Sequence, residues 1–145
     1  MNLTFRPATG EDIAALVQLN RELIEKYEDL SAIDLPRVLA WVGRKIEKNL
    51  NQYTCIFSDD VKAGYFRLCR EENSTELDDF YIFPGFQNRG IGTEVLRRCI
   101  REQLKPLTLC VFTKNTGAIA LYSRMGFRVT ERISNTRCIM RREVP

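Results

Sequence analysis

Residues 86–96, FQNRGIGTEVL, place two glycines one residue apart, directly after an apolar run and directly before a stretch with helical spacing. Glycine leaves room for backbone N–H groups to face outward, and the first turn of a helix has free N–H groups and a dipole that attracts anions. The stretch therefore predicts a strand–loop–helix unit that either holds a phosphate group or serves only as a packing turn.

Two common phosphate-binding loops do not fit this stretch. Gly85 and Gly90 have the spacing that begins a nucleoside-triphosphate loop, but the Lys and the Ser or Thr that must follow are replaced by Ile91 and Gly92. The dinucleotide pattern, started at Gly90, puts Val95 where a third small residue is needed. Its acidic residue, due about 20 positions on, would fall in the apolar run LCVF. Both kinds of nucleotide-binding domain are therefore disfavoured.

The elements expected around the loop occur in the order strand, two helices, three strands, helix, strand, helix and two strands. Apolar residues recur at helical spacing in 13–27 and 35–46, and the loop and residues 116–125 begin two further helices. The expected strands are 3–7, 53–57, 61–69, 76–83, 107–112, 127–133 and 136–143. Because three strands in series need only hairpins, we expect a single α/β (α+β) domain, residues 1–145, with a mostly antiparallel sheet.

The composition is typical of a globular protein without a nucleic-acid or membrane partner. The net charge of +3 is spread along the chain, whereas nucleic-acid binders concentrate basic residues in a stripe. No apolar run approaches the roughly 18 residues of a membrane helix, and the first residues lack the basic and apolar regions of a secretory signal. A cytoplasmic location is therefore expected.

The sequence contains five dispersed cysteines and no histidine. Without histidine, Ser-His-Asp and Cys-His hydrolases and the common zinc hydrolases are excluded, and no metal is expected. We interpret the cysteines as reduced core residues. Acid–base chemistry must then rely on Tyr, Glu, Asp, Lys or Cys.

A second informative stretch is residues 113–127, TKNTGAIALYSRMGF. Asn115 is placed to cap a short helix, and Gly126 to end it. Tyr122 lies on the same helix face as Met125, where its ring packs on Phe127 or its hydroxyl serves a reaction. The residues alone do not choose between these two roles.

Together, these stretches resemble the GNAT superfamily of acyl-CoA-dependent N-acetyltransferases. Residues 87–92, QNRGIG, match the family's pyrophosphate loop, and residues 115–127 match its Asn-x-x-Ala-x-x-Leu-Tyr-x-x-x-Gly-Phe motif. The opening FRPATGEDIAAL is similar to its first strand and helix. The resemblance implies a GNAT-like mixed, mostly antiparallel central sheet of about seven strands, flanked by about four helices and split into a V for acyl-CoA.

The resemblance also implies how acetyl-CoA, the co-substrate, is bound. Loop amides would hold the pyrophosphate, and the pantetheine arm would pair with the preceding strand. The implied binding residues are Tyr81, Ile82, Phe83, Gln87, Asn88, Arg89, Gly90, Ile91, Gly92, Thr93 and Asn115. A backbone N–H near Ile82 would polarise the thioester carbonyl.

Amine acetylation needs two proton transfers, and the resemblance implies Tyr122 as the acid. A phenol with a pKa of about 10 is protonated at neutral pH and can serve the leaving sulfur. Glu76 falls where some family members carry a glutamate base. Asp78 shares its strand face, whereas alternation puts Asp79 on the opposite face unless a bulge intervenes. The choice of carboxylate, or of a water relay that needs none, stays open.

The implied reaction transfers an acetyl group from acetyl-CoA to a primary amine by direct attack on the thioester. The alternative is a non-catalytic acyl-CoA sensor or interaction module, against which the retained tyrosine argues. The acceptor is a small-molecule or protein amine, and whether the protein is a homodimer is left open. Two sets of residues near the first two helices suit an acceptor: the acidic Glu25, Glu28, Asp29 and Asp34, and the aromatic Tyr27 and Trp41.

Overall fold

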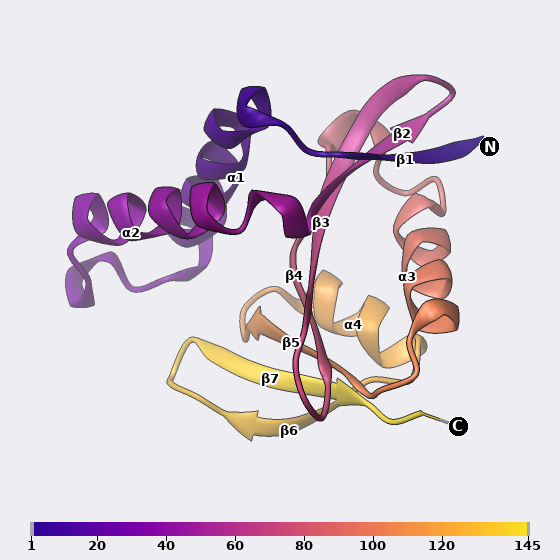
Figure 1. Cartoon of the computed structure of the whole chain (residues 1–145). Coiled ribbons are helices and arrows are strands. Elements are labelled where there is room, and N and C mark those ends of the chain that lie inside the picture. The colour runs from indigo at the N-terminus through magenta and orange to yellow at the C-terminus, as the bar shows by residue number, and fades with distance from the viewer. Residues whose placement is uncertain (1, 145) are drawn as a thin grey trace.

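The computed structural model describes residues 2–144 and shows a seven-stranded sheet between two pairs of helices (Figure 1). The strand order is β1-β2-β3-β4-β5-β7-β6, and only β4 and β5 pair in parallel. The strands are β1 (Leu3–Pro7), β2 (Tyr53–Ser58), β3 (Val61–Arg70), β4 (Thr75–Ile82), β5 (Leu107–Phe112), β6 (Arg128–Arg132) and β7 (Arg137–Arg142). The α-helices are α1 (Ile13–Tyr27), α2 (Leu35–Lys48), α3 (Ile91–Glu102) and α4 (Thr116–Arg124). The expected mixed, mostly antiparallel sheet is confirmed.

Helices α1 and α2 lie together on one face of the sheet (Figure 1). The carboxylate of Asp34 accepts the Arg37 N–H at 3.3 Å, and a proline stands in the first turn of α2, so the helix begins where the sequence indicates. Leu16 of α1 and Val42 and Ile46 of α2 are buried against this face of the sheet. They pack on Tyr53 and Cys55 of β2 and Tyr65 of β3. This layer forms one wall of the site described below.

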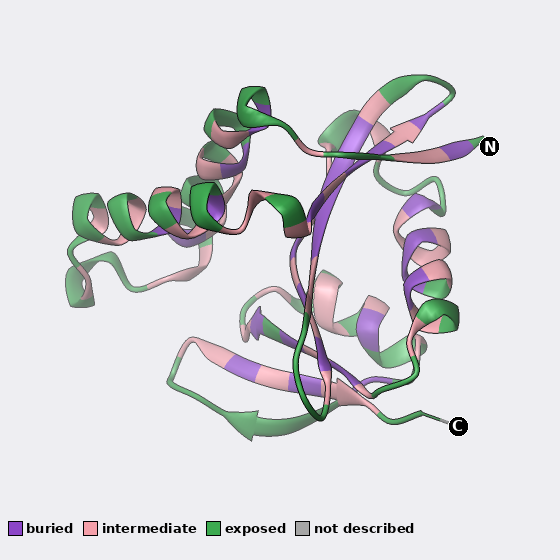
Figure 2. Ribbon diagram, viewed as in Figure 1, coloured by how far each residue is buried: buried purple, intermediate pink, exposed green. Residues whose placement is uncertain are grey.

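Helices α3 and α4 cover the opposite face. Ile91, Val95, Leu96 and Cys99 of α3 are buried against the sheet, and Figure 2 shows this inward side of the helix as buried. At the far end of the sheet, every residue of edge strand β6 is exposed. The larger core of the molecule therefore lies between the sheet and α3–α4.

Strands β3 and β4 approach each other unusually closely at Gly64. A Cβ atom at this position would lie 2.0 Å from the carbonyl oxygen of Tyr81, so only glycine fits. Just beyond, the register passes from Tyr65↔Tyr81 to Arg67↔Asp78, so that two residues of β4 oppose one of β3. This is a β-bulge, and Asp79 within it has a φ of 46°, in the left-handed region.

The bulge corrects one expectation from the sequence. Simple alternation placed Asp79 on the face opposite Glu76 and Asp78. Its carboxylate instead accepts a hydrogen bond from Tyr53 of the α1–α2 face, at 2.6 Å. The extra residue reverses the alternation, so all three carboxylates of β4 lie on one side of the sheet.

The parallel pairing of β4 with β5 is brief. Only Thr75↔Leu107 and Glu76↔Thr108 are paired among the described residues, after which the two strands separate. The Phe83 N–H bonds to Ala63 on the other side of β4, at 2.8 Å. Since successive residues of a strand direct their N–H groups to opposite sides, the Ile82 N–H points into the opening between β4 and β5.

Candidate active site

A cavity of about 650 Å³ extends from α1 and α2 to the opening between β4 and β5. Glu76, Asp78 and Asp79 line it from β4, and Tyr122 lines it from α4. The helices α1 and α2 supply mostly apolar side chains to the same cavity. Thus the opening left by the separated strands joins the carboxylates to the tyrosine of the second motif.

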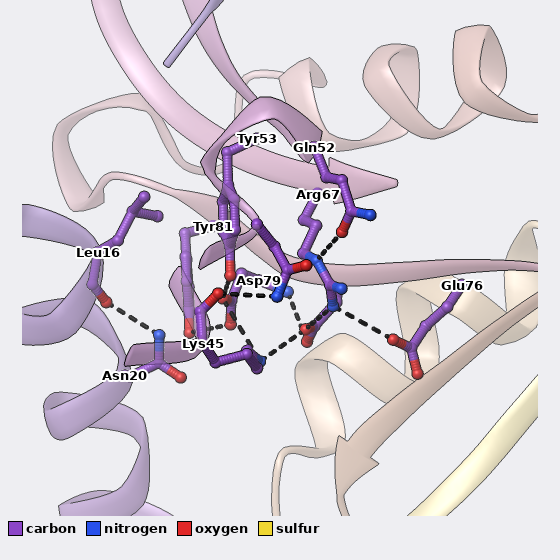
Figure 3. Close-up of polar contacts among 11 residues, drawn as sticks. Leu16, Asn20, Lys45, Gln52, Tyr53, Arg67, Glu76, Asp79 and Tyr81 are labelled. Carbon is purple, nitrogen blue, oxygen red and sulfur yellow. Dashed lines mark hydrogen bonds and ion pairs between the residues drawn. The ribbon is translucent and has the colours of Figure 1, made fainter. Parts of the chain in front are cut away.

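Asp78 lies at the centre of a charged cluster, of which Figure 3 labels Lys45, Arg67 and Glu76. Its Oδ2 atom is 2.9 Å from Lys45 Nζ and 3.0 Å from Arg67 Nη1, while its Oδ1 atom accepts the Asp79 N–H at 2.9 Å. Arg67 is almost buried and also donates to Gln52 at 2.8 Å. Asp78 is therefore held on both oxygens by donors from three elements.

Glu76 and Asp78 differ in how easily each takes up a proton. Burial would raise the pKa of Asp78, but the charges of Lys45 and Arg67 outweigh burial and lower it. Burial and the neighbouring negative charge of Asp78 raise the pKa of Glu76, which has only a 3.4 Å contact with Arg67. Of the two, Glu76 is the better proton acceptor near neutral pH.

Asp79 is enclosed by aromatic hydroxyls. Tyr53 and Tyr81 donate to its two oxygens at 2.6 and 3.2 Å, and the residue is 8% exposed. Burial and the charge of Asp78 raise its pKa. Because both of its oxygens are bonded, Asp79 stabilises the bulge and fixes the positions of the Tyr53 and Tyr81 hydroxyls (Figure 3).

Tyr122 is buried, and its ring packs on Phe127 at 5.7 Å between centroids. Both roles weighed from the sequence are therefore compatible with its position, since the residue also lines the cavity. Its hydroxyl makes no hydrogen bond to any residue in the described range 2–144. Burial and the charge of Asp78 raise the pKa of this phenol, so it stays protonated throughout the neutral range.

The glycine loop ends in an exposed helix start. Asn88 and Gly90 both have positive φ, 61° and 82°, and Gly90 caps α3. The first bond of the helix is from the Glu94 N–H to Gly90, which leaves the N–H groups of Ile91, Gly92 and Thr93 without partners inside the helix. These successive donors at the positive end of a twelve-residue helix can bind an anion.

Gly92 lies where the first turn of α3 meets α4 and β4. Its absent side chain faces Leu121, Ile82 and Phe80, 3.5 to 3.9 Å away, rather than the loop surface. A Cβ at this position would make ordinary van der Waals contacts with these side chains. Gln87 bends back and donates to the Ile82 carbonyl at 2.9 Å, at the edge of the opening.

The residues predicted for the site fall into three groups. Five of them line the common cavity: Glu76, Asp78, Tyr81, Asn115 and Tyr122. Ile82 and Phe83, at the end of β4, are outside the cavity lining, and the ring of Phe83 packs edge-on against Tyr65. Loop residues 87–93 lie at the start of α3, outside the cavity lining, and Arg89 rests 5.5 Å over the ring of Phe86. Asn115 caps α4 by accepting the Ala118 N–H at 3.2 Å.

The lining residues that were not predicted as site residues include Lys45, Arg67 and Cys110. Lys45 and Arg67 form the cation pair around Asp78, and Cys110 lines the cavity from β5. An arginine inside the apolar strand 61–69 was a usable signal, because an unpaired charge is rarely buried there. The interpretation of every cysteine as a core residue is wrong for Cys110, which is exposed because β5 has no partner on that side.

Two further searches covered the described part of the chain. No group of three or more His, Cys, Asp or Glu side chains within it could hold a metal ion. None of its helices is long and apolar enough to cross a membrane.

Residues 15–127 match the Acetyltransferase (GNAT) family. The chain belongs to this family. The match includes the glycine loop and runs to the end of the second motif, so the resemblance inferred from those two stretches is confirmed.

Among curated proteins, the GNAT chain is 29% identical over 108 residues to the peptidyl-lysine N-acetyltransferase YjaB of Salmonella typhimurium, covering 74% of the chain and 62% of that relative. It is 33% identical over 73 residues to the spermine/spermidine N(1)-acetyltransferase of Bacillus subtilis, covering 45% and 48% of the two chains. The first curated relatives are thus matched over less than two thirds of their own length, between 26% and 62%.

Solved structures match over nearly the whole GNAT fold. The PaiA N-acetyltransferase of Thermoplasma acidophilum, in complex with coenzyme A, has a TM-score of 0.71 at 21% identity and covers 99% of both chains. An acetyltransferase of Thermus thermophilus has a TM-score of 0.73 at 23% identity, covering 99% and 97%. The structure of YncA of Salmonella typhimurium with acetyl-CoA has a TM-score of 0.64 at 21% identity, covering 100% and 95%.

Proposed function

We propose that the protein transfers an acetyl group from acetyl-CoA to a primary amine. The observation that carries the proposal is the single cavity that joins Glu76, a carboxylate of raised pKa, to Tyr122, a phenol without a hydrogen-bond partner among the described residues. Membership of the GNAT family and the coenzyme A and acetyl-CoA complexes of similar structures support it.

The free N–H groups at the start of α3 would hold the pyrophosphate of acetyl-CoA. The pantetheine arm would lie in the opening between β4 and β5, where the Ile82 N–H has no strand partner. That N–H would donate to the thioester oxygen as negative charge develops on it. These roles keep the binding residues inferred from the sequence, Gln87 to Thr93 with Tyr81, Ile82, Phe83 and Asn115.

Glu76 is the proposed base. An alkylammonium acceptor has a pKa near that of lysine, about 10.4, so it must lose a proton before its nitrogen can attack. Glu76 takes this proton, and the nitrogen then forms the C–N bond to the acetyl carbon. Asp78 is fixed and anionic between Lys45 and Arg67, and it acts on the pKa of Glu76 rather than as the base.

Tyr122 is the proposed donor to the leaving group. As the C–S bond breaks, the sulfur receives the phenolic proton, and the second proton of the amine nitrogen restores the phenol. Ammonium and acetyl-CoA thereby give the amide, free coenzyme A and one proton. Because Tyr122 is protonated throughout the neutral range, this step does not limit the upper pH of the reaction.

The test combines ligand binding with turnover. Acetyl-CoA at 100 times its Kd should raise the free energy of unfolding by about 2.7 kcal/mol, a clear shift in Tm, whereas ATP and NAD should not. A panel of amines with acetyl-CoA should release the coenzyme A thiol. Binding without release for any amine would replace the enzyme by an acyl-CoA sensor, and no binding at all would overturn both.

A further inference from the structure

The negative charge of the cavity is confined to one end. Its acidic lining residues are Glu76, Asp78 and Asp79, all within four positions of β4. The helix-side carboxylates that the sequence suggested for a cationic acceptor do not line it. Each has another contact: Glu25 with Arg21, Glu28 with Arg137, Asp29 with Ser31, and Asp34 with the first turn of α2. The cavity therefore offers anionic groups to one ammonium only.

The rest of the wall that α1 and α2 supply is apolar. Leu23, Ile24, Val38, Trp41 and Val42 line the cavity from these helices. Trp41 is 56% exposed, an uncommon position for the largest apolar side chain. It also lines an adjoining hollow of about 320 Å³, together with Ile33, Val38 and the charged residues Asp34 and Arg37. An apolar body would fit along this wall.

Several polar side chains along the cavity already have partners within the protein. Asn20 donates to the Leu16 carbonyl at 2.9 Å, and Asn115 caps α4 (Figure 3 shows the first of these). Lys45 and Arg67 both bind Asp78, and Arg137 binds Glu28 at 3.1 Å. An acceptor carboxylate would therefore find each of these three cations already paired with a carboxylate of the protein, and leaving the acceptor's charge unpaired would be unfavourable.

We propose that the preferred acceptor is a primary amine carried on an aromatic or similarly apolar body. Its ammonium faces Glu76, and its ring lies against Trp41. The charge at one end excludes a second ammonium of a polyamine, and the apolar wall desolvates the ring. This assignment rests on the proposed acetyl transfer and specifies its substrate class.

An acceptor panel tests the assignment directly. Purified protein with saturating acetyl-CoA is offered 2-phenylethylamine, tryptamine, spermidine, a capped lysyl peptide and glycine, and thiol release is followed. The two arylalkylamines should have kcat/KM at least about tenfold above the others, the ratio expected from burying part of a ring. A higher kcat/KM for spermidine, the lysyl peptide or glycine overturns the assignment.

Trp41→Ala examines the wall itself. The residue is exposed on a helix and alanine is a strong helix former, so the variant should fold. The KM for 2-phenylethylamine should rise at least about tenfold with kcat within about twofold, because apolar contact with the acceptor is lost. Lys45, whose Nζ lies 5.6 Å from the centre of the Trp41 ring, keeps its ion pair with Asp78. Trp41→Phe keeps a ring and should recover most of the loss. Leu104→Ala, at a residue 93% exposed after α3, is the matched control and should change nothing. An unchanged KM in Trp41→Ala overturns the assignment.

Acetyl-CoA binding separates the two levels of inference. If acetyl-CoA binds and spermidine or the lysyl peptide is acetylated best, acetyl transfer stands and the arylalkylamine assignment fails. If acetyl-CoA does not bind, or binds without any thiol release, the proposed function fails and the assignment fails with it.

Discussion

Arg67 Nη1 lies 3.0 Å from Asp78 Oδ2, the same oxygen that Lys45 Nζ contacts at 2.9 Å. The two cations favour the ionised form of Asp78. Burial and the negative charge of Asp78 together raise the pKa of Glu76. The ion pairs of Asp78 with Lys45 and Arg67 therefore bear on the pKa of Glu76, the proposed base. The first two predictions follow from this relationship.

Glu76→Gln should lower kcat/KM at neutral pH by about 10²- to 10⁴-fold, the range for losing a general base. In the unmodified protein, activity should rise with pH through the pKa of Glu76, which lies above its ordinary 4.5. The variant should lack this acidic limb. A pH profile of kcat/KM from thiol release measures both effects. If Glu76→Gln kept the same rise of activity with pH, that rise would belong to another titrating group.

Asp78→Asn should move the acidic limb in a definite direction. Removing the negative charge beside Glu76 lowers the pKa of Glu76, so activity should persist to lower pH than in the unmodified protein. The neutral amide leaves Lys45 and Arg67 without an anionic partner, so some stability should also be lost. The pH profile of kcat/KM is recorded on Asp78→Asn that circular dichroism shows to be folded. An acidic limb shifted to higher pH than in the unmodified protein would contradict this prediction.

Tyr122→Phe should reduce kcat by about 10²- to 10⁴-fold while the Kd for coenzyme A stays unchanged. The ring would still pack on Phe127, and the lost hydroxyl has no hydrogen-bond partner in the described range, so Tm should be preserved. Steady-state kinetics and calorimetric titration of coenzyme A give the two quantities. An unaltered kcat would leave Tyr122 with a packing role alone.

Gly90→Ala and Gly117→Ala form a matched pair at the starts of two helices. A Cβ at either position meets nothing within 4 Å, but Gly90 has a φ of 82° and Gly117 does not have positive φ. Alanine at 90 should therefore cost about 1–2 kcal/mol in unfolding free energy, or distort the loop and weaken coenzyme A binding. Alanine at 117 should be neutral or stabilising by up to about 1 kcal/mol. Urea unfolding and coenzyme A titration compare them, and equal behaviour would argue against a role for the left-handed turn.

Asp12 should make the protein sensitive to acid. Its buried carboxylate accepts from Tyr65 at 2.7 Å and Lys62 at 2.5 Å; burial alone would raise its pKa, but these bonds and that of the Thr9 N–H lower it from 3.8 to about 2. The shift corresponds to about 2 kcal/mol that is present above pH 3.8 and lost as the pH falls through 2.

Asp12→Asn provides the comparison for this pH dependence. Urea unfolding between pH 2 and 5 should show a smaller decline of stability in the variant than in the unmodified protein. Parallel declines would show that other carboxylates are responsible.

The elements could be predicted from the sequence because their signals are local. The apolar run 107–112 and the strand 107–112 coincide, and the helix at 35 begins beside its capping aspartate. The site was harder to predict wherever it depends on tertiary packing. The bulge at Asp79 lies beside the close contact of Gly64 with Tyr81. The residues around position 79 contain no local pattern that predicts a bulge.

Lys45 and Cys110 also could not be assigned to the site from the sequence, because their positions depend on tertiary packing. In the sequence, Lys45 has the pattern of an exposed lysine near the end of a helix. It contacts Asp78 because α2 packs near β4 in the folded protein. Cys110 belongs to an apolar run that predicts a fully paired central strand, yet β4 leaves β5 before reaching it. Alternation along a chain identifies the residues of a face, but it does not reveal where two neighbouring strands separate.

The early end of the β4–β5 pairing has a mechanical consequence. The sheet consists of a four-stranded and a three-stranded half, joined at this seam by a short ladder of two residue pairs. A pantetheine arm lying in the seam would act as the missing strand and unite the halves. Amide hydrogen exchange should then slow on both sides of the seam at once when coenzyme A is added. Part of the rigidity of the sheet would then be supplied by the co-substrate.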